Sequence, residues 1–301
     1  MRDFLMRIWR KLTQIKALEP LIKFIRWFCG TDFFNTCLDF LETRVFHTSY
    51  DETAVFYKLN TERIERIASW FADEKSRKVY RNILAYRSTH HRKYMRGIVD
   101  RDQYFDKDII HFGTGEGFVD CGAYKGDTVA AFVRHLPDPE SYRHIIAFEP
   151  DDYNYKMLLR YLNSHHFSSS KVLAIHKGTW SSADVLHFRA NTEEACRIED
   201  DGEDTIETDT IDRVAGKRRI TYIKMDVEGA ETESLKGADE VISRDHPRLA
   251  ISIYHSDEEM LSIVEYIHQK YPFYDLYVRH YTYFYGDTVL YAIDPERPFD
   301  K

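Results

Sequence analysis

A short apolar run that ends in an acid and is followed by two glycines stands at residues 118–130, Phe-Val-Asp-Cys-Gly-Ala-Tyr-Lys-Gly-Asp-Thr-Val-Ala. This pattern predicts a buried strand, a tight turn and then a helix. Asp120 closes the strand, while Gly122 and Gly126 let the backbone fold closely against a ligand and against the next helix. A strand, turn and helix in this order are typical of an open parallel sheet with helices on both faces.

The same strand-then-acid pattern recurs at residues 145–150, Ile-Ile-Ala-Phe-Glu-Pro. In a doubly wound sheet both strand ends lie in one crevice, where nucleotide-like ligands bind. Glu149 is then placed to hold a ribose diol. This arrangement is typical of the site that cradles S-adenosylmethionine, which we expect to be the cofactor. A nicotinamide enzyme would instead need G-x-G-x-x-G after the first strand, and this chain has Asp-x-Gly-x-x-x-Gly there.

A third cluster of polar residues lies at 222–231, Tyr-Ile-Lys-Met-Asp-Val-Glu-Gly-Ala-Glu. Strand alternation puts Tyr222, Lys224 and Asp226 on one side of the predicted strand. Asp226 falls at the strand end, at the same edge as Asp120 and Glu149. Ionisable groups that converge at such an edge indicate a functional site, although a lone Lys–Asp salt bridge would explain the cluster structurally.

The remainder of the C-terminal region alternates strands with helices, as expected for a parallel sheet. The last two strands, 274–281 and 288–293, flank the turn Gly286-Asp287 and are predicted to form an antiparallel hairpin. The predicted fold is therefore α/β, a Rossmann-like class I methyltransferase fold with a mostly parallel twisted sheet. The acidic segment 191–210 lacks the ligand spacing of a calcium loop and is predicted to be a solvated, mobile loop.

The N-terminal third has a different character. Apolar positions three and four apart at 57–71 and 75–86 predict helices, so we expect a helical extension over 1–103 and an S-adenosylmethionine-binding domain over 104–301. Residues 1–29 carry seven basic and two acidic residues on an amphipathic pattern. Such a helix can lie on an anionic membrane surface. Alternatively its apolar stripe packs on the body of the protein or on a second subunit, as in a homo-oligomer.

Composition excludes several classes of protein. The net charge of −8 argues against a nucleic-acid partner, which requires a basic face. No run of about 18 apolar residues is present to span a membrane. The four cysteines form no C-x-x-C pair and no evident disulfide framework, which indicates a reducing, cytoplasmic compartment. Peripheral contact with the inner face of the membrane remains compatible with the basic N-terminus.

Four motifs together resemble the FkbM-type methyltransferases over roughly residues 104–293: Phe-Val-Asp-Cys-Gly-Ala at 118–123, Ala-Phe-Glu-Pro at 147–150, Asp-Thr-Ile-Asp at 209–212 and Lys-Met-Asp-Val-Glu-Gly-Ala-Glu at 224–231. The resemblance implies S-adenosylmethionine-dependent O-methylation, often of sugars or natural-product hydroxyls. The expected acceptor is therefore a hydroxyl of a sugar, glycan or glycolipid. Two positions depart from the family pattern: Tyr124, where many members have Asn, and Ser252, where many have an acid.

Methyl transfer to a hydroxyl calls for a base and for precise alignment. We predict His255 as the base, because its unperturbed pKa of about 6.5 suits proton transfer, with Asp226 as the second candidate. The predicted cofactor residues are Asp120, Gly122, Ala123, Tyr124, Gly126, Asp127, Thr128, Glu149, Pro150 and Thr179. The predicted substrate residues are Lys224, Glu228, Tyr254, Arg279 and His280.

Alternatives to this interpretation remain open. Asp226, Glu228 and His255 could hold Mg²⁺, but the sequence does not require it and we predict no metal. The acceptor could be a non-sugar molecule. A non-catalytic binding module with the same fold is the main alternative of another class, although such a module would be expected to lose Asp120, Glu149 or the 224–231 cluster.

Overall fold

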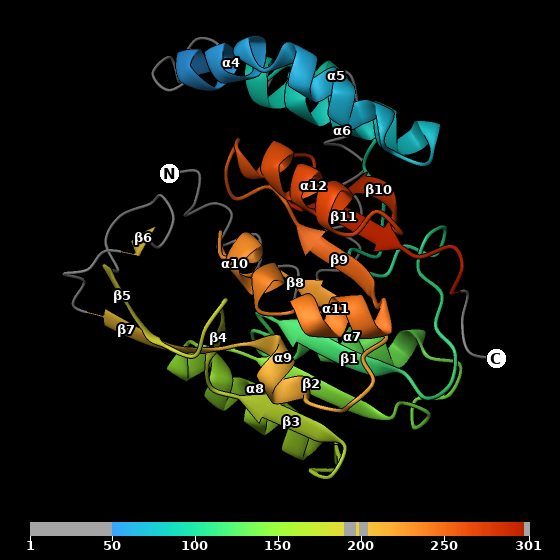
Figure 1. Ribbon diagram of the computed structural model, residues 1–301, viewed down its shortest axis with the longest axis vertical. Coiled ribbons are helices and arrows are strands. Elements are labelled where there is room, and N and C mark those ends of the chain that lie inside the picture. The colour runs from blue at the N-terminus through green and yellow to red at the C-terminus, as the bar shows by residue number, and fades with distance from the viewer. Residues whose placement is uncertain (1–49, 190–196, 199–203, 298–301) are drawn as a thin grey trace, which may run out of the picture.

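The structure is a computed structural model that describes residues 50–189, 197–198 and 204–297 (Figure 1). The basic segment 1–29 lies outside the described residues. None of the helices in the described part of the chain is long and apolar enough to cross a lipid bilayer.

A seven-stranded sheet forms the centre of the molecule. Its strand order is β10-β11-β9-β8-β1-β2-β3. The strands are β1 (Gly117–Cys121), β2 (His144–Phe148), β3 (Val172–Ile175), β8 (Tyr222–Met225), β9 (Arg248–Ser252), β10 (Asp275–His280) and β11 (Thr288–Ile293). All run parallel except β11, which is antiparallel to both of its neighbours. The predicted Rossmann-like fold with its C-terminal hairpin is confirmed.

Helices cover both faces of this sheet, which explains why its inner strands β1, β2 and β8 are buried along their whole length. The helices are α7 (Asp127–His135), α8 (Asp152–Ser164), α9 (Ile211–Ala215), α10 (Glu231–Lys236), α11 (Asp239–Asp245) and α12 (Glu259–Lys270). Neighbouring strand residues point to opposite faces: Val119 and Ile223 belong to one buried cluster, Phe118 and Tyr222 to the other.

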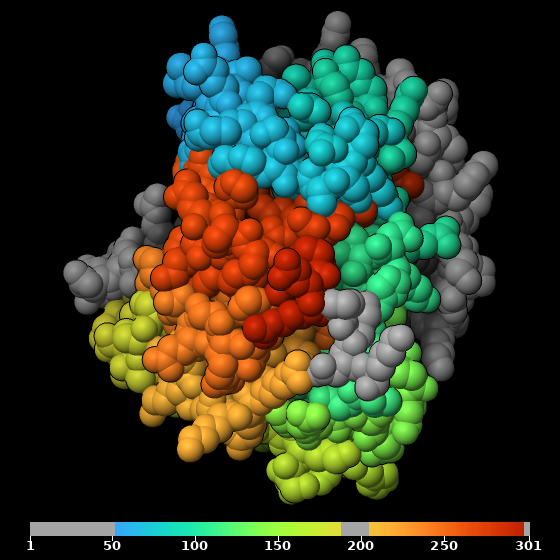
Figure 2. All heavy atoms as spheres, turned by 45° about the vertical axis from the view of Figure 1, so that its right-hand side comes forward, coloured from blue at the N-terminus to red at the C-terminus, as the bar shows by residue number. Residues whose placement is uncertain are grey.

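Three helices precede the sheet: α4 (Tyr50–Leu59), α5 (Thr61–Ser69) and α6 (Glu74–Thr89), followed by the short 3₁₀ helix η2 (Arg92–Met95). They lie against α12 and β10, and Figure 2 shows their blue and cyan atoms directly on the orange and red C-terminal part. Phe71 pairs with Leu276 of β10, and the hydroxyl of Tyr80 donates to the carbonyl of Met260. These helices share one apolar cluster with the sheet, and the domain boundary at residue 104 stays a prediction.

A second, smaller sheet has the order β4-β7-β5-β6, with β4 (Gly178–Thr179), β5 (Val185–Arg189), β6 (Arg197–Ile198) and β7 (Asp204–Asp209). The prediction of a solvated loop over 191–210 is wrong for β7. Ile206 pairs with Leu186, and the buried Thr208 hydroxyl donates to the carbonyl of Asp184. The prediction gave weight to the acids and overlooked the β-branched residues between them, which favour a strand.

Candidate active site

The turn between β1 and α7 is unusually tight. Gly122, Tyr124 and Gly126 all have positive φ, at 78°, 49° and 90°. A Cβ atom on Gly122 would lie 2.0 Å from the main-chain oxygen of Asp226, so only glycine fits there. The turn is held from the β2 side as well, because the N–H of Gly122 and that of Ala123 both donate to the carbonyl of Phe148.

A buried ion pair lies beneath this turn. Lys224 of β8 places its Nζ 3.2 Å from Asp120 Oδ1, and it also donates to the carbonyl of Gly122 at 2.7 Å. Burial raises the pKa of Asp120 to about 7, although the charge of Lys224 acts in the opposite direction. Lys224 is 2% exposed and supports the turn, and its predicted contact with the substrate stays a prediction.

Glu149, which follows β2, is tied to the same turn. Its carboxylate accepts hydrogen bonds from the N–H of Tyr124 at 2.7 Å and from the N–H of Asp151 at 3.0 Å. Burial raises the pKa of Glu149, partly offset by these two bonds. Glu149 therefore links the ends of β1 and β2, and each oxygen retains a lone pair for a ligand hydroxyl.

The residues around the turn fit the predicted cofactor. Neither carboxylate oxygen of the fully buried Asp120 has a hydrogen-bond partner within the described residues. No described side chain caps the first turn of α7, which begins beside Gly126 at Asp127 and Thr128. Uncapped N–H groups and a close glycine turn suit the polar groups of S-adenosylmethionine.

Two predicted cofactor residues have different surroundings. Pro150 is half-buried and follows Glu149 directly, at the crevice edge. Thr179 lies in β4, and its buried hydroxyl is 2.6 Å from the hydroxyl of Ser234. Thr179 thus fastens α10 to the small sheet. Its predicted contact with the cofactor stays a prediction.

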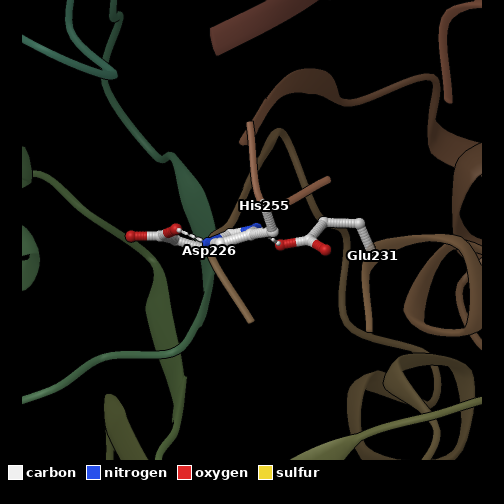
Figure 3. Close-up of side chains that lie close together, drawn as sticks. All are labelled: Asp226, Glu231 and His255. Carbon is white, nitrogen blue, oxygen red and sulfur yellow. Dashed lines mark ion pairs between the residues drawn. The ribbon is translucent and has the colours of Figure 1, made fainter. Parts of the chain in front are cut away.

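A histidine between two carboxylates forms the second part of the site. The imidazole of His255 lies between Asp226 and Glu231 (Figure 3). Its Nε2 is 3.3 Å from Asp226 Oδ1, and its Nδ1 is 3.1 Å from Glu231 Oε1. The carboxylate of Glu231 also accepts from the N–H of Val227 and that of Gly229, both at 3.0 Å. Glu231 therefore holds both the turn after β8 and the imidazole ring of His255 in place.

Two tyrosines orient Asp226. The hydroxyl of Tyr104 donates to Asp226 Oδ2 at 2.9 Å, and the hydroxyl of Tyr254 donates to Oδ1 at 3.2 Å. Tyr104 also lies 3.1 Å from the hydroxyl of Ser252 and has a φ of 68°. Asp226 still exposes 26% of its side chain, so a ligand can reach it.

The protonation states of Asp226 and His255 depend on the charged and polar groups packed around them. Burial on its own would raise the pKa of Asp226, but His255, Lys224 and Tyr104 outweigh it and hold the pKa well below its usual range. Burial on its own would lower the pKa of His255, but Asp226 and Glu231 raise it to about 11. At neutral pH His255 is therefore protonated in this arrangement and Asp226 is ionised.

The predicted substrate residues do not come together. Glu228 and Tyr254 lie beside His255 and Asp226. Arg279 is 2% exposed and binds Asp73 and Ser76 of the α6 N-terminus. His280 is fully buried, and its Nδ1 is 2.9 Å from the hydroxyl of Thr288. Arg279 and His280 thus occupy positions in the core, and their predicted contacts with the substrate stay predictions.

Sequence reasoning missed two residues of the site. Glu231 stands in the quoted 224–231 motif, and its distance of five residues from Asp226 was a usable signal for a turn that brings both back together. Tyr104 offered no such signal, because it lies in the segment leading into the domain and meets Asp226 across 122 residues of sequence.

Comparison with known proteins agrees with this geometry. The model of the methyltransferase FkbM domain matches residues 120–285, more than half of the chain. The chain belongs to the FkbM methyltransferase family. Residues 120–285 thus form a methyltransferase domain whose cofactor is S-adenosylmethionine. A comparison with curated proteins found no match.

Solved structures include a clear relative of this FkbM-family chain. Methyltransferase FkbM from Methylobacillus flagellatus KT is 27% identical with a TM-score of 0.70; the match covers 81% of this chain and 62% of that one. The chain thus spans less than two thirds of that protein.

Weaker likenesses include an rRNA methylase from Streptococcus thermophilus (12% identity, TM-score 0.41, covering 62% of this chain and 89% of that one). Another is Aeropyrum pernix fibrillarin with S-adenosyl-L-methionine bound (12% identity, TM-score 0.35, covering 60% of this chain and 67% of that one). Neither score is high enough to bear on function.

Proposed function

We propose that this FkbM-family chain transfers a methyl group from S-adenosylmethionine to a hydroxyl of a sugar, glycan or glycolipid. The observation that carries the proposal is Asp226, an ionised and partly exposed carboxylate whose backbone adjoins the cofactor turn at Gly122. A carboxylate there can accept a hydrogen bond from an acceptor hydroxyl next to the methyl donor. The sugar class of the acceptor comes from the family resemblance.

The cofactor supplies an activated methyl group on a sulfonium, so the protein has to align the acceptor and remove one proton. In this proposal Asp226 Oδ1 or Oδ2 accepts the hydrogen bond of the acceptor hydroxyl and then takes its proton. A carboxylate with a low pKa can do so, because an oxygen that is gaining a methyl group becomes far more acidic than an alcohol. Tyr104 and Tyr254 keep the carboxylate in place during this step.

His255 takes a different part from the one predicted from sequence. An imidazole that is already protonated cannot accept the hydroxyl proton, so we propose it as a positioning residue for Asp226. Its positive charge keeps Asp226 ionised, and Glu231 holds the ring from its other side.

The test compares cofactor binding with methyl transfer. S-adenosylmethionine binding would be measured by calorimetry, and transfer of a labelled methyl group with a glycolipid extract and with free methyl glycosides as acceptors. We expect Asp226→Asn to bind the cofactor within a few-fold of the original chain but to transfer methyl about 10²–10⁴-fold more slowly. Glu233→Gln, which removes a half-buried carboxylate of α10 that pairs with Lys236, is the matched control and should behave as the original.

The outcomes separate the parts of the proposal. A folded chain that binds no S-adenosylmethionine would favour the non-catalytic module. Binding with transfer to other hydroxyls but to no glycan would refute only the sugar acceptor. Full activity in Asp226→Asn would remove Asp226 from the mechanism.

We also propose that residues 1–29 contact an anionic membrane surface, on the strength of their basic and amphipathic sequence. The full chain should sediment with vesicles that contain phosphatidylglycerol, and a chain without residues 1–29 should not. Equal sedimentation of both would refute the contact, and a dimer lost on deletion would favour the second-subunit alternative.

A further inference from the structure

An excess of negative charge surrounds His255. Among the described residues, the ion pairs of Asp226, Glu228 and Glu231 all go to this one imidazole. Glu259 also interacts electrostatically with Glu231 and His255, and its Oε2 has no hydrogen-bond partner in the part of the chain that the structure describes. Lys224, the nearby lysine, is engaged with Asp120. Four carboxyl groups thus gather around one imidazole.

Two carboxylate oxygens lie near Nε2, at distances somewhat longer than the separation of two neighbouring ligands on one ion. Nε2 lies 3.3 Å from Asp226 Oδ1 and 3.7 Å from Glu228 Oε2. Two ligand atoms about 2.1 Å from an ion and at right angles to each other are about 3.0 Å apart. The His255 side chain is 8% exposed, yet neither ring nitrogen makes a well-aligned hydrogen bond to any residue that the structure describes. A buried ring nitrogen without a hydrogen bond therefore points at two carboxylates.

The other side of the ring has the arrangement that usually supports a metal-bound histidine. Such a histidine donates its second ring N–H to a carboxylate, which fixes the ring orientation. Glu231 stands 3.1 Å from Nδ1 in this position (Figure 3). Its carboxylate is itself held by two main-chain N–H groups.

Glu228 lies on the side of the site that faces solvent. Its side chain is 75% exposed, so an ion could enter from this side. Its φ is 56°, a conformation that favours glycine, and the next residue is Gly229 with a φ of 98°. The chain thus keeps a carboxylate at a position where a glycine would be less strained.

We propose that Asp226, Glu228 and Nε2 of His255 bind a divalent transition-metal ion, with Glu231 as the carboxylate that orients the ring. The ion would replace the proton on Nε2 and leave Nδ1–H to donate to Glu231. One imidazole with two carboxylates suits Mn²⁺, Fe²⁺ or Zn²⁺ better than Mg²⁺. The bound ion would take over from the His255 proton the positive charge beside Asp226. Its use, to hold the acceptor oxygen beside Asp226, rests on the proposed function.

The experiment titrates Mn²⁺ into the full chain after treatment with EDTA and follows free Mn²⁺ by electron paramagnetic resonance. We expect one ion per chain with a Kd in the micromolar range. Asp226→Asn and His255→Gln should each weaken binding at least tenfold, and Glu231→Gln about tenfold, because loss of a supporting carboxylate typically costs 10–100-fold. Glu233→Gln removes the same charge from the same helix and should bind as the original chain does.

Two outcomes would overturn the inference: no stoichiometric Mn²⁺ binding by the folded chain, or equal binding by His255→Gln and Glu233→Gln. Because His255 and Asp226 are largely buried and their variants can unfold, Glu228→Gln provides a second test. Its exposed side chain should not affect folding, and we expect at least threefold weaker Mn²⁺ binding. S-adenosylmethionine binding measured in EDTA distinguishes failure of this site from failure of the proposed function.

Discussion

Gly122 stands where any side chain would collide with the main chain of Asp226, directly after the neighbouring strand β8. Replacement by Ala puts a Cβ 2.0 Å from the Asp226 carbonyl oxygen and strains a φ of 78°. We expect Gly122→Ala to lower the free energy of unfolding by more than about 3 kcal/mol, or to displace the turn and weaken S-adenosylmethionine binding at least tenfold. Urea unfolding and calorimetry measure the two effects.

Gly216→Ala is the matched control for Gly122→Ala. Gly216 also has a positive φ, of 55°, but its nearest atom would be 4.0 Å from an added Cβ. Its ψ of −124° lies outside the left-handed helical region, so this variant should show the cost of backbone strain alone, about 1–3 kcal/mol, and unchanged cofactor binding. Equal effects of the two variants would mean that the collision at Gly122 is unimportant.

His280 makes the stability of the protein sensitive to acid. Burial lowers the pKa of His280 to about 4, whereas in the unfolded chain it is about 6.5. Between these values the unfolded chain binds more protons than the folded one, so stability falls as the pH falls from about 6.5 to 4. The loss should reach up to about 3 kcal/mol.

The variant His280→Asn can keep a polar atom near Thr288 but does not titrate. Its unfolding free energy, measured in urea at pH 7.5, 6 and 4.5, should decline less steeply toward acid than that of the original chain. Parallel pH profiles for the two proteins would contradict the assignment of this acid sensitivity to His280.

At the scale of elements, one aspartate joins the start of α6 to β10. Asp73 accepts from the N–H of Ser76 at 2.6 Å as the N-cap of α6, and from Arg279 Nη2 at 2.7 Å. Asp73→Ala removes the cap and leaves a buried guanidinium with fewer partners. We expect a loss of about 2–4 kcal/mol in the free energy of unfolding, measured in urea.

Asp108→Ala is the control for the contact between the start of α6 and β10. Asp108 forms an exposed ion pair with Lys75 at 3.4 Å, a type of pair that contributes little to stability. Its unfolding free energy should stay within about 0.5 kcal/mol of the original. If Asp73→Ala were equally neutral, the link between α6 and β10 would be unimportant for stability.

At the scale of the whole molecule, the N-terminal helices and the sheet behave as one core. Tyr80, Ile83 and Phe71 belong to the same buried cluster as Ile263 of α12 and Leu276 of β10. A chain reduced to residues 104–301 would expose the apolar surfaces of α12 and β10 around Ile263 and Leu276 to water. We therefore expect it to be insoluble or to unfold without a cooperative transition, measured by circular dichroism. Cooperative unfolding and normal cofactor binding by residues 104–301 would show that the boundary at 104 separates independent domains.

The sequence by itself determined the central sheet and the cofactor edge. The inner strands are local runs of mostly apolar residues. Asp120 is the last residue but one of β1, while Glu149 and Asp226 directly follow β2 and β8. Because parallel strands end at one edge of a sheet, the nearness of these acids follows from local pattern alone.

Only the tertiary structure decided what surrounds those acids and how they are charged. Tyr104 reaches Asp226 across 122 residues, and Arg279 finds Asp73 across 206. Local pattern cannot predict such pairs, because they depend on how separate elements pack. The same holds for His255: its type suggested a base, but the carboxylates packed around it raise its pKa to about 11 and make it a cation. A side chain's chemistry is set by its neighbours in space, and packing chooses those neighbours.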